Sequence, residues 1–79
     1  MEIKVFSNEN CIFCKRQKDW LLENNINFIE KDIAIRENLI EFNSYKAFGT
    51  PLTIIKKEDE IYQVVGFNRI KLKKLLSIR

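Results

Sequence analysis

The chain has 79 residues, of which 46% are hydrophobic and 32% are charged, with two cysteines, no histidine and a formal net charge of +3. This length fits one small domain, so we predict a single domain over residues 1–79, and the low content of glycine and proline excludes collagen-like and low-complexity chains. The positive charge is spread along the chain, which argues against nucleic acid as a partner.

The first half of the chain predicts two strands that alternate with two helices. Residues 3–6 form a short β-prone run. Residues 12–24 contain no glycine or proline and repeat apolar side chains at helical spacing, so they predict a helix. Residues 27–33 are a second strand candidate, and a helix over 35–45 follows from its apolar spacing. The apolar residues of that last pattern are Ile35, Leu39 and Phe42, with Ile40 at its margin.

The second half predicts a β-hairpin and a final helix. Gly49 ends the preceding helix, and Pro51 opens an apolar run at residues 52–55. A charged turn leads to residues 61–65, which pair with that run, and Asn68 is a good N-cap for the last helix. The order βαβαββα predicts an α/β fold with a four-stranded mixed sheet flanked by three helices, because a strand-helix-strand start implies a parallel crossover and a hairpin adds antiparallel strands.

The N-terminus and the apolar runs predict where the protein is found. The opening MEIKVFSN lacks the charged and then apolar layout of a signal peptide. No apolar run approaches the roughly 20 residues that a membrane span needs. We therefore expect a cytoplasmic protein that makes no membrane contact.

Cys11 and Cys14 form a C-x-x-C motif where the first predicted helix begins. A structural zinc site uses four Cys or His ligands, so a metal could be bound only between chains or with an added thiol ligand, and we predict no metal site within the chain. A disulfide across so short a loop contributes only about 2 kcal/mol, which makes a structural clip a weak alternative. A second alternative is that both cysteines are buried in the core and have no redox role. The position within a strand-helix-strand unit favours a redox pair.

The helix start gives the two cysteines different roles. Unpaired amides and the helix dipole stabilise an anion there, so we expect Cys11 to ionise below the free-thiol value of about 8.5 and to be the nucleophile. Cys14, one turn further in, can attack the mixed disulfide and act as the resolving thiol. Lys15, Arg16 and Lys18 add positive potential, with a solvated helix face as their alternative role.

The aromatic residues divide into core and site candidates. Phe13 lies between the two cysteines, so we expect it to be exposed and to form an apolar rim for a substrate. Phe67 is a second candidate of this kind. The aromatics expected in the core are Phe6, Trp20, Phe28 and Phe42.

Three landmarks stand in order along the chain. They are C-I-F-C at 11–14, after the first strand, G-T-P at 49–51, before the third, and V-G-F-N at 65–68, before the last helix. With them the chain resembles a dithiol glutaredoxin of the thioredoxin-fold superfamily, from Ile3 to about Leu76. The resemblance implies a dithiol-disulfide oxidoreductase that reduces protein or glutathione mixed disulfides, with no bound cofactor, glutathione as co-substrate and a monomeric state.

The resemblance also implies substrate-binding residues. Thr50 and Pro51 would be joined by a cis bond facing the cysteines, where the Thr50 backbone can pair with an extended thiol peptide. Gly66, Phe67 and Asn68 would take the γ-glutamyl carboxylate of glutathione at the helix start.

The chain departs from the family pattern at several positions. Asn8 stands where many glutaredoxins carry a basic residue, and Ile12-Phe13 stands where many have Pro-Tyr. The segment 67–69, Phe-Asn-Arg, replaces the acidic residues that often follow the turn glycine.

Two other functions remain open. GFNRIKLKKL at 66–75 is similar to the closing segment of the glutaredoxin-like donors to ribonucleotide reductase, which a thioredoxin reductase recharges, although their tryptophan-containing signature is missing. The other is an iron-sulfur cluster carrier, in which two chains and two glutathiones share one cluster through each Cys11.

Overall fold

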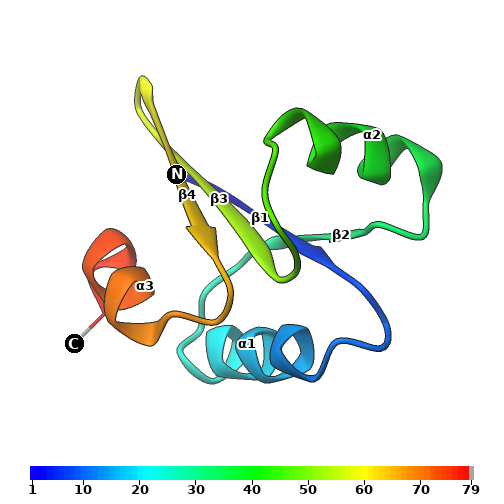
Figure 1. Cartoon of the computed structure of the whole chain (residues 1–79). Coiled ribbons are helices and arrows are strands. Elements are labelled where there is room, and N and C mark those ends of the chain that lie inside the picture. Colours follow the sequence, from blue (N-terminus) through cyan, green and yellow to red (C-terminus); the bar gives the residue numbers. More distant parts are fainter. Residues whose placement is uncertain (79) are drawn as a thin grey trace.

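A computed structural model describes residues 1–78 of the chain (Figure 1). Its elements are β1 (Glu2–Ser7), α1 (Ile12–Glu23), β2 (Ile29–Asp32), α2 (Arg36–Ser44), β3 (Leu52–Lys57), β4 (Glu60–Val65) and α3 (Arg69–Leu76). This confirms the predicted order βαβαββα. None of the helices in this described part is long and apolar enough to cross a lipid bilayer.

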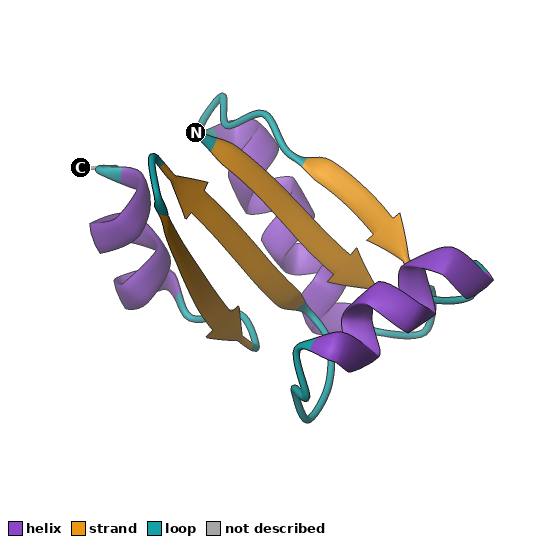
Figure 2. Ribbon diagram, turned by 90° about the horizontal axis from the view of Figure 1, so that it is seen from above, coloured by secondary structure: helices purple, strands orange, loops and turns teal. Residues whose placement is uncertain are grey.

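The four strands form one mixed sheet in the order β2-β1-β3-β4. β1 pairs in parallel with β2 and antiparallel with β3, with Val5 opposite Thr53, and β3 pairs antiparallel with β4. The parallel pair β1–β2 follows from the crossover through α1, and the antiparallel pair β3–β4 follows from the hairpin. The predicted four-stranded mixed sheet flanked by three helices is confirmed (Figure 2).

Each face of the sheet has its own core. α1 and α3 cover one face through a cluster of Ile3, Val5, Leu21, Ile55, Val64, Leu72 and Leu76. α2 covers the other face through a cluster of Phe6, Phe42, Leu52 and Ile54. Phe6 and Phe42 are buried as predicted, whereas Trp20 and Phe28 are partly buried and pack against the first cluster. α1, which carries both cysteines near its start, is therefore held on the sheet by its later turns.

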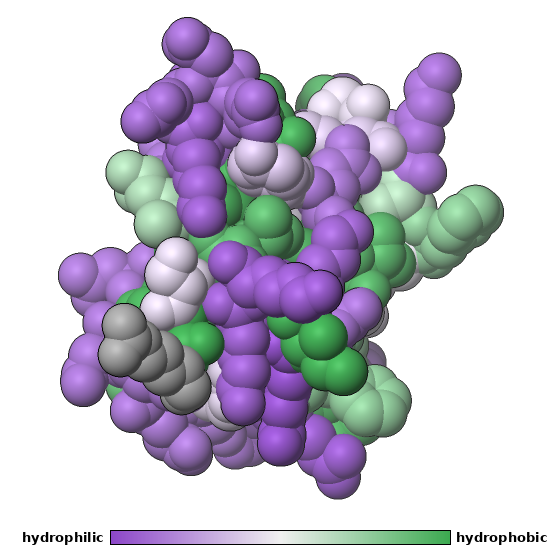
Figure 3. All heavy atoms as spheres, turned by 90° about the vertical axis from the view of Figure 1, so that its left-hand side faces the viewer, coloured by the Kyte–Doolittle hydropathy of each residue, from purple (hydrophilic) through white to green (hydrophobic). Residues whose placement is uncertain are grey.

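The outward face of α3 is charged. Lys71, Lys73 and Lys74 are exposed, while Leu72 and Leu76 are buried against the sheet. The side of the molecule that carries α3 is mostly hydrophilic, with hydrophobic side chains visible between the hydrophilic ones (Figure 3). The helix is therefore amphipathic, with its leucines against the sheet and its lysines toward solvent.

The apolar residues whose spacing predicted α2 are only partly buried. The helix begins at Arg36, and Ile35 and Leu39 of the apolar pattern are exposed. Contact with the sheet comes from the end of the helix, where the Phe42 and Tyr45 rings each lie 5.9 Å from the Phe6 ring. An apolar spacing defines one face of a helix, but it does not require that the whole face meets a partner.

Candidate active site

A tight turn sets the start of α1. The backbone amide of Cys11 donates to the carbonyl of Asn8 at 3.0 Å, and the amide of Asn10 donates to Oδ1 of Asn8 at 3.3 Å. Cys11 is the N-cap residue of the helix, with an extended backbone, and its Sγ accepts a hydrogen bond from the amide of Cys14 at 3.1 Å. Asn8, predicted to bind substrate, therefore also closes the turn that positions the motif.

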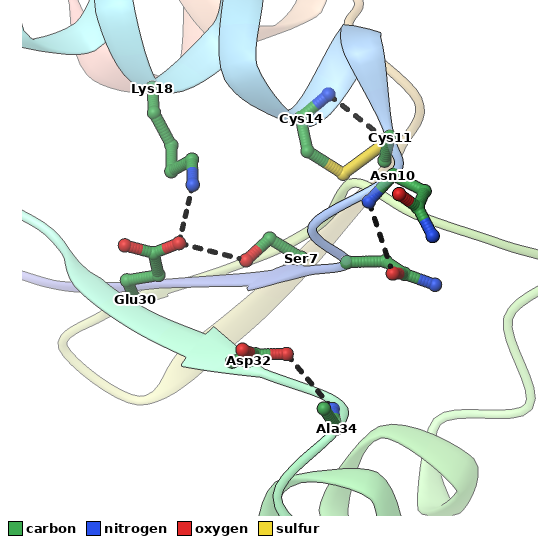
Figure 4. Close-up of polar contacts among 9 residues, drawn as sticks. Ser7, Asn10, Cys11, Cys14, Lys18, Glu30, Asp32 and Ala34 are labelled. Carbon is green, nitrogen blue, oxygen red and sulfur yellow. Dashed lines mark hydrogen bonds and ion pairs between the residues drawn. A yellow bond between two sulfur atoms is a disulfide. The ribbon is translucent and has the colours of Figure 1, made fainter.

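The two cysteines are joined in a disulfide (Figure 4). They differ in exposure to solvent. Their Cα atoms lie 5.2 Å apart, within the usual range for a disulfide. Cys11 is partly exposed at the helix start, whereas Cys14 is 1% exposed. A substrate sulfur can therefore reach Cys11 more readily than Cys14.

The loop before β3 lies against Cys11. The Sγ of Cys11 is 3.6 Å from the carbonyl oxygen of Thr50, a contact without a hydrogen bond because a disulfide sulfur carries no hydrogen. The Thr50–Pro51 peptide bond is cis, and Pro51 is fully buried. The ladder of β3 begins at Leu52, so Thr50 lies outside the sheet pairing, beside the sulfur.

The third landmark is joined to the second by a backbone hydrogen bond. The amide of Gly66 donates to the carbonyl of Pro51 at 2.8 Å. Gly66 has a φ of 77°, a conformation that residues with a side chain rarely adopt. Asn68 then caps α3, where its Oδ1 accepts from the amide of Lys71 at 3.1 Å. The second landmark, at 49–51, thus contacts both of the others, Cys11 through Thr50 and Gly66 through Pro51.

An open depression lies at the N-terminus of α3. It has a volume of about 660 Å³ and is lined by residues 65–70, which include the predicted site residues Gly66, Phe67 and Asn68. Because Asn68 uses its side-chain oxygen for the cap, an anion here would meet backbone amides and the positive end of the helix.

The two candidate rim aromatics have different environments. Phe13 is 53% exposed, as predicted, and the guanidinium of Arg16 lies 5.6 Å from the centre of its ring. Phe67 is instead partly buried, with its ring centre 5.7 Å from that of Trp20. Sequence reasoning missed Phe48, which is fully exposed two residues before Thr50. Its place in the loop beside the proline was the signal that could have identified it.

The cations of α1 are mostly engaged with acidic side chains. Lys15 pairs with Asp19 at 3.3 Å, and Lys18 pairs with Glu30 on β2. The buried Ser7 donates a hydrogen bond to the same Glu30 carboxylate at 3.0 Å (Figure 4). The hydrogen bond from Lys18 holds the pKa of Glu30 below its usual value, against the opposing effect of burial, and Ser7 adds to this lowering.

These ion pairs partly neutralise the lysines of α1, so the lysines add less positive potential at the cysteine pair than their number indicates. The guanidinium of Arg16 instead lies over the exposed ring of Phe13, the residue between the two cysteines. Ser7 and Glu30 were not predicted, since neither belongs to a motif. No cluster of three or more Cys, Asp or Glu side chains suited to a metal ion is found within residues 1–78.

Comparison with known proteins identifies the family. No family model matches the chain. The chain is 32% identical over 77 residues to an uncharacterised glutaredoxin-like 8.6 kDa protein of the rubredoxin operon of Clostridium pasteurianum, and the match covers 95% of this chain and 97% of that protein. This chain belongs to the glutaredoxin-like proteins. The resemblance inferred from the three landmarks is thereby confirmed.

Solved structures support the same fold. A mutant of the thioredoxin-like protein BC3987 superposes with a TM-score of 0.76 at 33% identity, covering 99% of this chain and 97% of that one. The glutaredoxin-like NrdH-redoxin from Escherichia coli has a TM-score of 0.75 at 17% identity, with 95% of each chain covered. The fold is thioredoxin-like, and with its C-x-x-C pair this glutaredoxin-like protein is a thiol-disulfide oxidoreductase.

Proposed function

We propose that the protein reduces protein disulfides and glutathione mixed disulfides, with Cys11 as the attacking thiolate and Cys14 as the resolving thiol. The unequal exposure of the two residues carries this proposal, because Cys11 is partly exposed and Cys14 is buried. The helix start stabilises a thiolate at Cys11, and the Cys14 amide donates to its sulfur. An incoming disulfide therefore reaches the more acidic thiol first.

Reduction takes two exchange steps. The Cys11 thiolate attacks one sulfur of the substrate disulfide, which breaks that bond, forms a mixed disulfide and releases the other substrate sulfur as a thiolate. The Cys14 thiolate then attacks the Sγ of Cys11, which forms the Cys11–Cys14 disulfide and releases the second substrate thiolate. The protein ends in the disulfide form, and an external thiol donor returns two electrons to it.

Glutathione is the proposed donor, and the cycle uses no bound cofactor. The depression at the start of α3 offers backbone amides to a carboxylate. The Gly66–Pro51 hydrogen bond connects this depression to the loop beside Cys11. A thiol tripeptide can therefore bind there with its sulfur directed to Cys11. A cytoplasmic location fits this cycle because cytosolic thiols are kept reduced. A monomer also fits, because both cysteines of the pair belong to one chain.

One observation favours a second electron source. The side chain of Asn8 is neutral and closes the turn before Cys11, so it offers no cation to a carboxylate of glutathione. A redoxin recharged by a thioredoxin-reductase-type flavoprotein, with ribonucleotide reductase as its partner, is the alternative. The fold shared with the NrdH-redoxin is compatible with that alternative.

A two-reductant assay tests the proposal. The substrate is a glutathionylated peptide, and turnover is measured with glutathione plus glutathione reductase and, separately, with a thioredoxin reductase. We expect measurable turnover with glutathione that is abolished by Cys11→Ser. Turnover with the thioredoxin reductase alone would replace glutathione as the donor, and activity that survives Cys11→Ser would contradict the proposed nucleophile.

A further inference from the structure

α1 buries an amide side chain one turn after the cysteine pair. Gln17 and Thr53, on the facing strand β3, are both 0% exposed. Nε2 of Gln17 donates a hydrogen bond to Oγ1 of Thr53 at 2.5 Å. The other end of the amide, Oε1, is also buried and has no hydrogen-bond partner within residues 1–78. A buried acceptor without a donor destabilises a folded protein, and each such atom therefore requires an explanation.

The position of Gln17 on the helix indicates a donor. Gln17 follows Cys14 by three residues, so their Cβ atoms are neighbours on one helix face, about 5–6 Å apart. Both residues are buried, which places this shared face against the sheet. In the disulfide form the Sγ of Cys14 carries no hydrogen. Reduction adds one, and the new thiol is a hydrogen-bond donor in a site closed to solvent.

We propose that Oε1 of Gln17 accepts the S–H hydrogen of Cys14 in the dithiol form. In the structure the Thr53 hydroxyl accepts from Nε2 of Gln17, and this leaves Oε1 as the end of the amide that can accept a new donor. Gln17 is thus a positioning residue for the resolving thiol. The inference rests on the proposed cycling of Cys11 and Cys14 between disulfide and dithiol, and it is independent of the identity of the electron donor.

The proposed bond changes the redox equilibrium. It exists only when Cys14 carries a hydrogen, so it stabilises the dithiol relative to the disulfide and makes the protein easier to reduce. It also favours the neutral form of the Cys14 thiol, while the helix start favours the thiolate of Cys11. In the reduced protein Cys11 would then be the thiolate and Cys14 the protonated thiol. Cys14 would lose its proton only when it attacks the mixed disulfide on Cys11.

The equilibrium with dithiothreitol measures this effect directly. Dithiothreitol gives two electrons and two thiol hydrogens to the protein disulfide and closes to its own cyclic disulfide, so the protein S–S bond breaks as the other forms. Wild type and Gln17→Leu are equilibrated with mixtures of reduced and oxidised dithiothreitol at pH 7, alkylated and quantified by mass spectrometry. A double variant with Thr53→Val removes the hydroxyl that Gln17→Leu leaves without its partner.

We expect both variants to shift the equilibrium constant about fivefold toward the disulfide, the effect of one hydrogen bond present only in the dithiol. For a two-electron couple this corresponds to a potential about 20 mV more negative. Leu21→Ala is the matched control, because Leu21 is equally buried on α1 but apolar. It should lower the stability of both redox forms and change the constant less than twofold.

A constant that stays within twofold of wild type in both Gln17 variants would overturn the inference, as would a shift no larger than that of Leu21→Ala. Circular dichroism of each redox form establishes that the variants are folded. Because the equilibrium uses dithiothreitol, the expected shift would support the inference even if glutathione turnover were absent.

Discussion

The Sγ of Cys11 lies 3.6 Å from the carbonyl oxygen of Thr50, a residue 39 positions later in the chain. Pro51 follows Thr50 and accepts a hydrogen bond from the amide of Gly66 at 2.8 Å. Three separate segments are therefore linked by contacts that begin at one partly exposed sulfur. A disulfide that approaches Cys11 therefore comes close to the backbone of Thr50.

Cys11 should form a thiolate at lower pH than a free cysteine. Its sulfur is at the N-cap of α1 and accepts a hydrogen bond from the amide of residue 14, which persists in the variant Cys14→Ser because it is a backbone bond. The rate of alkylation of that variant, followed against pH, should have a midpoint below about 8. A midpoint at or above the free-thiol value of about 8.5 would remove the basis for assigning Cys11 as the nucleophile.

A cation at position 8 should improve the use of glutathione. Asn8→Lys places a positive charge in the turn before Cys11, and a surface charge contact is worth up to about 1 kcal/mol, so kcat/KM for glutathione should rise by up to about fivefold at low salt. The gain should shrink at high salt because of screening. Asn8→Ala is the control, since it also removes the hydrogen bond to Asn10 but adds no charge. Equal activity of the two variants at low salt would show that charge is not the limiting factor.

Two exposed aromatics, one between the cysteines and one in the loop before Thr50, should contribute to the binding of protein substrates. Phe13 and Phe48 are 53% and 101% exposed, so Phe13→Ala and Phe48→Ala should change the free energy of unfolding by less than about 0.5 kcal/mol. We expect each to raise KM for a protein disulfide several-fold. Phe42→Ala is the control for stability, because loss of this buried ring should lower the free energy of unfolding by about 3–5 kcal/mol. Unchanged KM values in both exposed variants would exclude these rings from the binding surface.

Glu41 should make stability depend on pH in the acid range. Its carboxylate on α2 lies 2.9 Å from Nζ of Lys4 and 3.2 Å from Nζ of Lys31. The hydrogen bond from Lys4 is the main cause that lowers the pKa of Glu41, against burial, and Lys31 contributes further. Because the folded-state pKa is lowered, this stabilisation is fully present above the unfolded value of about 4.5 and is lost as pH falls through the folded value.

Thermal unfolding of Glu41→Gln tests this dependence. At pH 7 we expect a loss of about 1 kcal/mol, or about 4–8 °C in Tm, and a smaller difference from wild type below pH 4. Glu23→Gln, at the exposed end of α1, should leave the acid dependence as in wild type. If the difference in Tm between Glu41→Gln and wild type does not decrease in acid, the loss of stability comes from packing and not from the charge of Glu41.

Local signals predicted the element order and the position of the cysteine pair. Helix spacing, the N-cap Asn68 and the β-branched run before the hairpin each act within a few residues, so they can be read from the sequence. The exposure of Ile35 and Leu39 could not be predicted in this way. It depends on which part of α2 contacts the sheet, and only the end of the helix packs against Phe6.

Contacts between distant residues could not be predicted either. Burial of Gln17 depends on a hydroxyl 36 residues away on Thr53. The pairing of Lys18 with Glu30 requires α1 to lie over β2. Phe67 packs against Trp20 because α3 and α1 share one face of the sheet. The cysteines were identified because a short motif at a helix start carries its own chemistry.

The most direct test of the central claim is to trap the mixed disulfide. Reduced Cys14→Ser is mixed with a peptide disulfide, quenched in acid and digested, and the adduct is located by mass spectrometry. Cys11→Ser is treated in parallel. The account predicts a stable adduct on Cys11 in the first variant and much slower adduct formation in the second, because Cys14 is buried and lies inside the first turn of the helix. Adduct formation on Cys14 at a comparable rate would contradict the assignment of Cys11 as the attacking thiol.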